Sequence, residues 1–160
     1  MAGDPLVTRR HLPLTAAAVT ATAVVGAAGT DVRSRWYAEL DTPPWQPPGA
    51  VFGPAWTTLY ALLAAGSARA LDRAAPEQRR ALGRALAVNL VLNAGWSWAF
   101  FKAHRPALAL AEVVALEAST LDLVRRARAV DPVAGRLLAP YAGWVGFATA
   151  LTASITRRNR

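Results

Sequence analysis

The chain has 160 residues, the length of one domain, and 54% of them are apolar. This apolar share and a positive mean hydropathy exceed what soluble domains usually carry and favour a membrane protein. The formal net charge is +8, but the arginines lie between long uncharged runs and not on a basic face with interleaved aromatic residues. We therefore expect no nucleic-acid partner. The lack of cysteine excludes disulfides, thiol nucleophiles and cysteine-ligated metals.

Five long runs of low charge predict five membrane-crossing helices. Residues 12–30, 51–68, 85–101 and 137–156 carry no charge, and residues 107–124 have the same length and an apolar background. About 20 residues cross the hydrocarbon core of a bilayer. A soluble bundle would need charged outer faces, which four of these five segments lack. We predict one all-α domain over residues 1–160, an integral membrane bundle with helices at about 12–30, 51–70, 84–102, 106–126 and 135–156.

The N-terminus also resembles an export signal. Arg9 and Arg10 precede the first apolar run, and small residues at 27–29 offer a cleavage site. However, the run is longer than an ordinary signal core, and its removal would leave four helices and an orphaned loop. We therefore favour a retained first helix.

Basic residues predict how the bundle is oriented in the membrane. Eleven arginines lie on the side of the N-terminus, against seven basic residues on the other side. The excess predicts a cytoplasmic N-terminus and an outward-facing first loop. Lys102 is the single lysine and alanine is abundant, which we interpret as the codon bias of a GC-rich bacterium. The expected location is thus a bacterial cell membrane.

The loop at residues 31–50 is stiff and aromatic, unlike a flexible connector. Its prolines and aromatic residues are Trp36, Tyr37, Pro43, Pro44, Trp45, Pro47 and Pro48. Because proline fixes φ and removes a backbone donor, no regular helix or central strand fits there. We predict a fixed cover on one end of the bundle.

Aromatic and amide side chains recur at helical spacing on three of the predicted helices. The stripes are Phe52, Trp56 and Tyr60; Asn89, Asn93, Trp96 and Phe100; and Tyr141, Trp144, Ala148 and Thr152. Such stripes commonly form helix-packing cores or interface belts, and this alternative stays open. Amides in a membrane helix, however, must find polar partners at a helix contact or around a cavity.

Two carboxylates interrupt the fourth predicted helix. Glu112 and Glu117 are costly at mid-bilayer, and each must be protonated, paired or turned to an internal cavity. They lie ~140° apart around the helix, so they cannot share one wall. We expect Glu112 to line a cavity, and Glu117 to make an interhelical hydrogen bond while protonated. His11 and His104 have no ligand spacing around them, so no metal site is expected.

Small residues form two ridges, at Ala18, Thr22 and Gly26 and at Ala142, Gly146 and Ala150. Such ridges let two backbones approach closely. They fit either packing within one chain or the face of a homodimer, and the sequence leaves both alternatives open.

Several separated blocks resemble the TspO/MBR family, the tryptophan-rich sensory proteins that include the mitochondrial translocator protein or peripheral benzodiazepine receptor. The resemblance covers residues 36–159. The blocks are Trp36-Tyr37, Pro43-x-Trp45-x-Pro47-Pro48, Phe52-Gly53-Pro54-x-Trp56-Thr57-x-Leu59-Tyr60, Leu92-Asn93-x-x-Trp96, Phe100-Phe101, Leu137-Leu138-x-Pro140-Tyr141-x-x-Trp144-x-x-Phe147-Ala148 and Arg158-Asn159. Thr42, Ala50 and Thr152 depart from the family pattern.

The resemblance implies a five-helix membrane protein, often a homodimer, with a porphyrin pocket among the helices beneath the first loop. Together with the stripes it gives these expected ligand-binding residues: Trp36, Tyr37, Trp45, Phe52, Trp56, Tyr60, Asn89, Asn93, Trp96, Phe100, Glu112, Trp144, Phe147 and Ala148. Animal members bind cholesterol, but the fifth-helix sterol motif is absent here, because no basic residue follows Tyr141 before Arg157.

We therefore predict a receptor- or transporter-like membrane protein that binds a porphyrin (protoporphyrin IX or haem-like) or another planar hydrophobic ligand, with no required cofactor. Flat macrocycles stack on aromatic faces, and arginines near the mouth could hold propionates. Two other functions stay open. Some bacterial relatives are reported to degrade protoporphyrin IX in light, which would make Trp56 and Trp144 candidate catalytic residues. The third alternative is a structural or regulatory membrane protein whose aromatic core only packs.

Overall fold

The computed structural model describes residues 10–160, which form helices and contain no β-strand. The elements are α1 (Leu12–Gly29), α2 (Arg35–Ala38), α3 (Gly49–Arg73), α4 (Pro76–Ser97), the π-helical turn η1 (Trp98–Lys102), α5 (Pro106–Val130) and α6 (Pro132–Arg158). The all-α prediction is confirmed, as is the irregular loop, apart from the single turn of α2. The four long helices after α1 run past the predicted bounds, because charged residues end an apolar run without ending a helix, whereas α1 ends one residue before its predicted bound.

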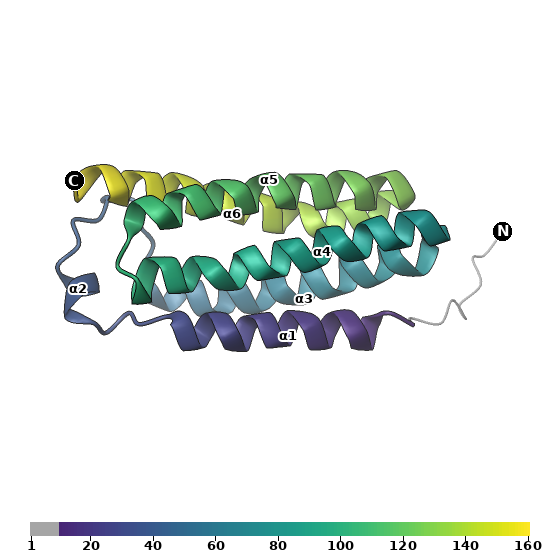
Figure 1. Ribbon diagram of the computed structural model, residues 1–160, viewed down its shortest axis with the longest axis horizontal. Helices are drawn as coiled ribbons and strands as arrows, with labels where there is room; N and C mark the ends of the chain where they lie inside the picture. Colours follow the sequence, from purple (N-terminus) through teal and green to yellow (C-terminus); the bar gives the residue numbers. More distant parts are fainter. Residues whose placement is uncertain (1–9) are drawn as a thin grey trace.

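The five long helices lie side by side along the long axis of the molecule (Figure 1). α1 packs on α3 and α4, α5 packs between α4 and α6, and α6 closes the bundle against α3. The loop with α2 and the C-terminus lie at the left end in Figure 1, and α1 begins at the right end. We call the left end, where residues 30–48 connect α1 to α3, the loop end.

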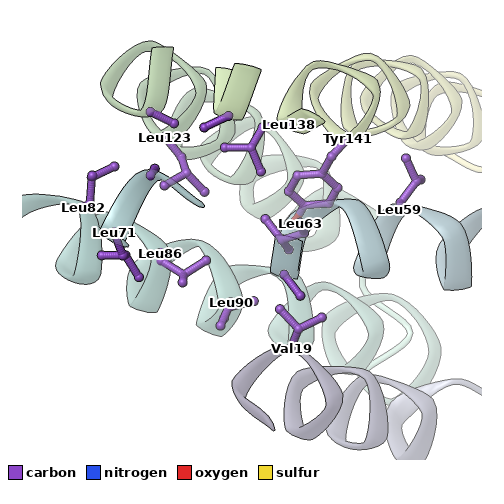
Figure 2. Close-up of a cluster of buried hydrophobic side chains, with 14 of the residues drawn as sticks. Val19, Leu59, Leu63, Leu71, Leu82, Leu86, Leu90, Leu123, Leu138 and Tyr141 are labelled. Carbon is purple, nitrogen blue, oxygen red and sulfur yellow. The ribbon is translucent and has the colours of Figure 1, made fainter. Parts of the chain in front are cut away.

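The core consists mainly of leucines from four helices, together with Val19 of α1 (Figure 2). Leu63 of α3 and Leu138 and Tyr141 of α6 are fully buried where these helices cross. α1 is held against α3 by the Thr15 hydroxyl, which donates to the carbonyl oxygen of Ala64 at 2.9 Å. A second, smaller group of buried residues, which includes Phe100 and Phe101, packs at the loop end.

Both small-residue ridges contact helices of the same chain. A methyl group added to Gly26 of α1 would meet the Ser97 hydroxyl of α4 at 3.7 Å, and one on Gly146 of α6 would meet the Glu117 carboxylate of α5 at 3.5 Å. At these two positions, therefore, the ridge serves packing within the chain.

Asp131 joins three helices at the end opposite the loop. Its side chain caps α6 by accepting from the backbone N–H of Val133 at 2.7 Å and of Ala134 at 3.2 Å. The same carboxylate lies 3.0 Å from Nε of Arg69 and 2.8 Å from Nε of Arg73, both on α3. Burial alone would raise the pKa of Asp131, but these hydrogen bonds and the arginine charge hold it below its ordinary value. The cluster ties the start of α6 to the end of α3.

By length and composition alone, one described helix, α1, is apolar enough to cross a membrane. α5 instead carries Glu112, Glu117 and Asp122, and α3 and α4 include charged residues at the ends that face away from the loop. The five helices are thus confirmed, while five membrane crossings stay a prediction. Arg9, the first arginine of the export-like pair, lies outside the described residues.

Candidate ligand-binding cavity

A cavity of about 790 Å³ lies at the loop end of the bundle. Its walls come from α1, α3, α4, η1, α6 and the covering loop, and within residues 10–160 no wall residue comes from α5. The lining residues are Ala23, Gly26, Ala27, Thr30, Val32, Tyr37, Gln46, Gly49, Phe52, Gly53, Trp56, Tyr60, Asn93, Trp96, Ser97, Phe100, Phe101, Trp144, Phe147, Ala148, Leu151, Thr152 and Ile155. None of these described residues is charged, so the cavity suits an uncharged, mainly apolar molecule.

Aromatic rings from α3 and α6 meet along one wall of the cavity. The ring of Trp144 lies 5.8 Å from that of Phe52 and 6.2 Å from that of Trp56, both in edge-to-face geometry. Trp56 also lies 5.2 Å from Tyr60. This is the geometry expected when the predicted stripes face each other. Each ring of the wall thus packs against at least one neighbouring ring.

The opposite wall is built by the π-helical turn at the end of α4. Trp96 stacks on Phe100, with ring centroids 5.4 Å apart, and Phe101 meets Phe100 edge-on at 4.9 Å. Adjacent residues of a regular α-helix point about 100° apart. The wider turn of η1 brings both Phe100 and Phe101 into the wall, and the 3.6-residue spacing used for the prediction could not indicate this for Phe101.

The loop of residues 30–48 covers the cavity and is fixed in place at several points. Trp36 stacks on His104 at 4.5 Å, and the ring of Tyr37 lies 5.3 Å from that of Phe101. The backbone N–H of Asp41 donates to Oδ1 of Asn159 at 3.0 Å, and Nδ2 of Asn159 donates back to the Asp41 carbonyl at 3.0 Å. The loop is therefore tied to the end of α6, in keeping with the predicted fixed cover.

The floor of the cavity leads into a chain of hydrogen bonds. The Tyr60 hydroxyl donates to Oδ1 of Asn93 at 2.8 Å, and Nδ2 of Asn93 donates to the Tyr141 hydroxyl at 2.9 Å. The Tyr141 hydroxyl donates to Oδ1 of Asn89 at 3.0 Å, and Nδ2 of Asn89 donates to the Thr120 hydroxyl at 2.9 Å. The chain thus links α3, α4, α6 and α5 and satisfies the two amides that the sequence singled out.

Two buried polar atoms of the cavity wall have no hydrogen-bond partner among residues 10–160. Nε1 of Trp96, a donor, and Oε1 of Gln46, an acceptor, are both buried and unpaired. The amide nitrogen of Gln46 donates to the Tyr37 hydroxyl at 3.4 Å. Because an unpaired buried polar group costs about 1–3 kcal/mol, these atoms are suited to hydrogen bonds with a bound molecule.

The structure brings ten of the fourteen predicted site residues to this cavity: Tyr37, Phe52, Trp56, Tyr60, Asn93, Trp96, Phe100, Trp144, Phe147 and Ala148. Trp36 stands behind the wall, with its ring 5.4 Å from Phe100. Trp45 is 48% exposed, and its ring lies 6.0 Å from that of Phe147. Asn89 is fully buried beneath the floor, one turn deeper than Asn93.

The two glutamates of α5 lie apart from the cavity. Glu112 was expected to line it, but its carboxylate packs against Gly95 of α4, where a Cβ atom would collide with Oε1. The physical reason is that α5 stands behind α4 and α6 at this level. Glu117 was expected to make an interhelical hydrogen bond, but its buried Oε2 has no partner among residues 10–160, and its Oε1 lies beside Gly146 of α6.

The contributions of α1 and of the loop amide to the cavity were not predicted from the sequence. Ala23, Gly26 and Ala27 of α1 and Gln46 of the loop all line the cavity. The small residues of α1 were interpreted as a surface for close helix packing. Their spacing alone does not reveal that a cavity adjoins them. Gln46 carried a usable signal, because it is the one amide within the proline-rich run.

Comparison with known proteins gives the family of this chain. The family model of TspO/MBR matches residues 14–158. The chain belongs to the TspO/MBR family. It is 35% identical to protein CrtK of Rhodobacter capsulatus over 150 residues, which cover 92% of this chain and 94% of that protein. It is 34% identical to the human translocator protein over 128 residues, which cover 78% and 75% of the two chains.

A third TspO/MBR relative, the tryptophan-rich protein TspO of Chlorobaculum tepidum, is 35% identical over 128 residues and covers 79% of this chain and 80% of its own. Trp56 and Trp144, two of the tryptophans on which the resemblance rests, are neighbours in the cavity wall of this TspO/MBR chain. The aromatic residues that mark the sequence therefore gather around one cavity.

Proposed function

We propose that this TspO/MBR protein binds a porphyrin, or another planar hydrophobic molecule, in the cavity beneath the covering loop. The observation that carries the proposal is a cavity of about 790 Å³ with aromatic walls and no charged lining residue among those described. Ligand pockets for small molecules commonly measure about 300–1,000 Å³. Flat macrocycles bury a large apolar area and stack on aromatic faces, so they match both the size and the chemistry of the walls.

The carboxylates of such a ligand would stay at the mouth. Transferring an ionised carboxylate into an uncharged apolar cavity is strongly unfavourable. Val32 lines the cavity, and the exposed Arg33 follows it directly in the loop. An arginine at this place would pair with a propionate while the rest of the macrocycle lies among the rings.

We further propose that the bundle is an integral protein of a bacterial cell membrane, with five crossings and a cytoplasmic N-terminus. Large apolar side chains are exposed on the outer faces of α1, α4 and α5, including Val25, Val91 and Val114. Val91 is 72% exposed, which suits contact with lipid. The arginine excess at the end opposite the loop supports the orientation.

The proposed function is tested by titrating the purified protein in nanodiscs with protoporphyrin IX. We expect the Soret absorbance to change along a saturable curve with one ligand bound per chain, because one cavity takes one macrocycle. Empty nanodiscs of the same lipid serve as the control, since porphyrins partition into bilayers. Binding that is no stronger than to the empty discs would refute the proposal.

One observation favours a second function, the oxidative degradation of porphyrin. Trp56 and Trp144 lie 6.2 Å apart in the same wall, so two oxidisable indoles would face one side of a bound macrocycle. Light- and oxygen-dependent loss of protoporphyrin IX by the protein, absent in the dark or without oxygen, would establish this function. Binding without such loss leaves the protein a receptor or carrier.

A further inference from the structure

In the hydrogen-bond chain beneath the cavity, every member donates toward Thr120 and accepts from the side of the cavity. Thr120, the end farthest from the cavity, sets this direction. The Thr120 hydroxyl of α5 is fully buried and donates its single hydrogen to the Leu116 carbonyl at 2.8 Å. The Thr120 oxygen can therefore only accept from Asn89, whose nitrogen lies 2.9 Å away. A threonine that bonds to the carbonyl four residues earlier is a common helical arrangement, so this end of the chain is well fixed.

The direction then passes from residue to residue toward the cavity. Because Asn89 presents its amide nitrogen to Thr120, it presents its oxygen to Tyr141, which must donate. The Tyr141 oxygen then accepts from the nitrogen of Asn93, and the oxygen of Asn93 accepts from Tyr60. Each amide has one oxygen and one nitrogen, so reversing any single link would set two donors or two acceptors against each other.

Tyr60 is the last member of the chain and lines the cavity. Its hydroxyl hydrogen is committed to Asn93, so only the lone pairs of its oxygen remain for a bound molecule. A tyrosine that usually either donates or accepts is here restricted to accepting. A ligand carbonyl or carboxylate at this place would set oxygen lone pairs against oxygen lone pairs in a site without charged side chains.

We propose, on the basis of the proposed porphyrin site, that the cavity floor selects ligands whose inward edge carries a neutral hydrogen-bond donor, such as a hydroxyl or N–H group. The acceptor is Tyr60, and Thr120 is a positioning residue that acts through the chain without touching the ligand. The donor edge of the macrocycle points to Tyr60, and its carboxylate edge points to the covering loop.

Trp96 does not remove this selectivity. Its unpaired indole N–H can satisfy an acceptor on the ligand equally well in a donor-bearing or an acceptor-only porphyrin. A hydroxyl group both donates and accepts, whereas a ketone only accepts. Gln46, whose Oε1 is the other unpaired acceptor of the cavity wall, lies in the covering loop, on the side of the propionate edge that both porphyrins share. The difference between the two porphyrins at the opposite edge therefore reports on Tyr60, and the Tyr60→Phe variant separates it from any contribution of Gln46.

The test compares two porphyrins that share the same propionate edge and differ at the opposite edge, one with two 1-hydroxyethyl groups and the other with two acetyl groups. Dissociation constants are measured by Soret absorbance in nanodiscs. We expect the hydroxyethyl porphyrin to bind about tenfold more tightly to the wild type, the range expected when a buried acceptor gains or lacks its donor. In Tyr60→Phe the ratio of the two constants should fall to about one.

Variants of Thr120, at the far end of the hydrogen-bond chain, test whether the direction of the hydrogen bonds sets the preference, because Thr120 does not touch the ligand. Thr120→Val removes the fixed end, so we expect the preference to fall severalfold, whereas Thr120→Ser keeps the hydroxyl and the preference. Thr149→Val is the matched control. Thr149 of α6 also bonds to the carbonyl four residues earlier, Val145 at 2.9 Å, but lies outside the chain. Its loss should leave the ratio unchanged.

Saturable binding of both porphyrins with equal constants by the wild type would overturn this inference and leave the proposed function standing. The inference is also overturned if the ratio is the same in Thr120→Val as in Thr120→Ser. If neither porphyrin binds saturably, the proposed function fails together with the inference.

Discussion

Replacing Trp56 with alanine is expected to weaken the binding of protoporphyrin IX roughly 5- to 150-fold. Trp56 stands at the centre of the aromatic wall, in contact with Tyr60, Tyr141 and Trp144. Stacking of a flat heteroaromatic ring on one aromatic side chain contributes about 1–3 kcal/mol, which converts to this range of affinity. The measurement is the Soret absorbance of the ligand, because the substitution itself removes tryptophan fluorescence.

Trp98→Ala is the matched control for this change. Trp98 is a tryptophan near the same end of the bundle, but it is 45% exposed and is not part of the cavity wall. The affinity of the Trp98→Ala variant for protoporphyrin IX should stay within about twofold of the wild type. Unchanged affinity in Trp56→Ala, or an equal loss in both variants, would mean that the aromatic wall does not bind the porphyrin.

Tyr141→Phe is expected to lower the free energy of unfolding by about 1–3 kcal/mol. The change keeps the fully buried ring but removes the hydroxyl that joins Asn93 to Asn89, so one amide donor and one amide acceptor lose their partner. Interhelical hydrogen bonds in membrane proteins average about 0.6 kcal/mol, and two such bonds give the lower figure. The upper value of about 3 kcal/mol applies if the amide groups of Asn89 and Asn93 stay buried without a partner. Reversible unfolding in mixed micelles measures the difference.

The comparison variant is Tyr60→Phe, which removes one hydrogen bond at the cavity end of the same chain. Tyr60→Phe removes one hydrogen bond where Tyr141→Phe removes two, and Asn93 lines the cavity rather than the closed core, so the loss should be smaller than in Tyr141→Phe. Equal stability of Tyr141→Phe and the wild type would show that the chain does not stabilise the bundle.

The sequence predicted the five helices and the faces of three of them because these features depend on local spacing. The 3.6-residue repeat placed Trp56, Tyr60 and Trp144 on faces that do meet in the structure. The amides Asn89 and Asn93 were expected to need partners, and in each of them both the oxygen and the nitrogen are hydrogen-bonded. A residue's face follows from the sequence, and so does its need for a hydrogen bond.

Depth along a helix and the choice of neighbouring helix did not follow from the sequence. Asn89 and Asn93 share one face, yet only Asn93 reaches the cavity, because the core closes between them. Because a charge in the membrane is costly, Glu112 was expected to avoid lipid. A contact with a neighbouring helix removes the carboxylate from lipid as well as a cavity does, and Gly95 of α4 leaves the space for such a contact. The contact depends on how α4 and α5 pack, which a single sequence does not encode locally.

Phe101 was missed for a different physical reason. Its neighbour Phe100 belongs to the predicted stripe, and in a regular helix Phe101 would point elsewhere. The π-helical turn at Trp98–Lys102 changes the local repeat, and no proline or glycine within it marks the change. Departures of this kind depend on the tertiary packing of the rings and so are hidden from periodicity.

The location of the bound porphyrin tests the central claim most directly. A structure of the complex with protoporphyrin IX, solved in nanodiscs, would show where the macrocycle lies. We expect it between the wall of Trp56 and Trp144 and the wall of Trp96 and Phe100, with the propionates toward the covering loop. A porphyrin bound on the outer face of the helices, with the cavity empty, would contradict the proposal.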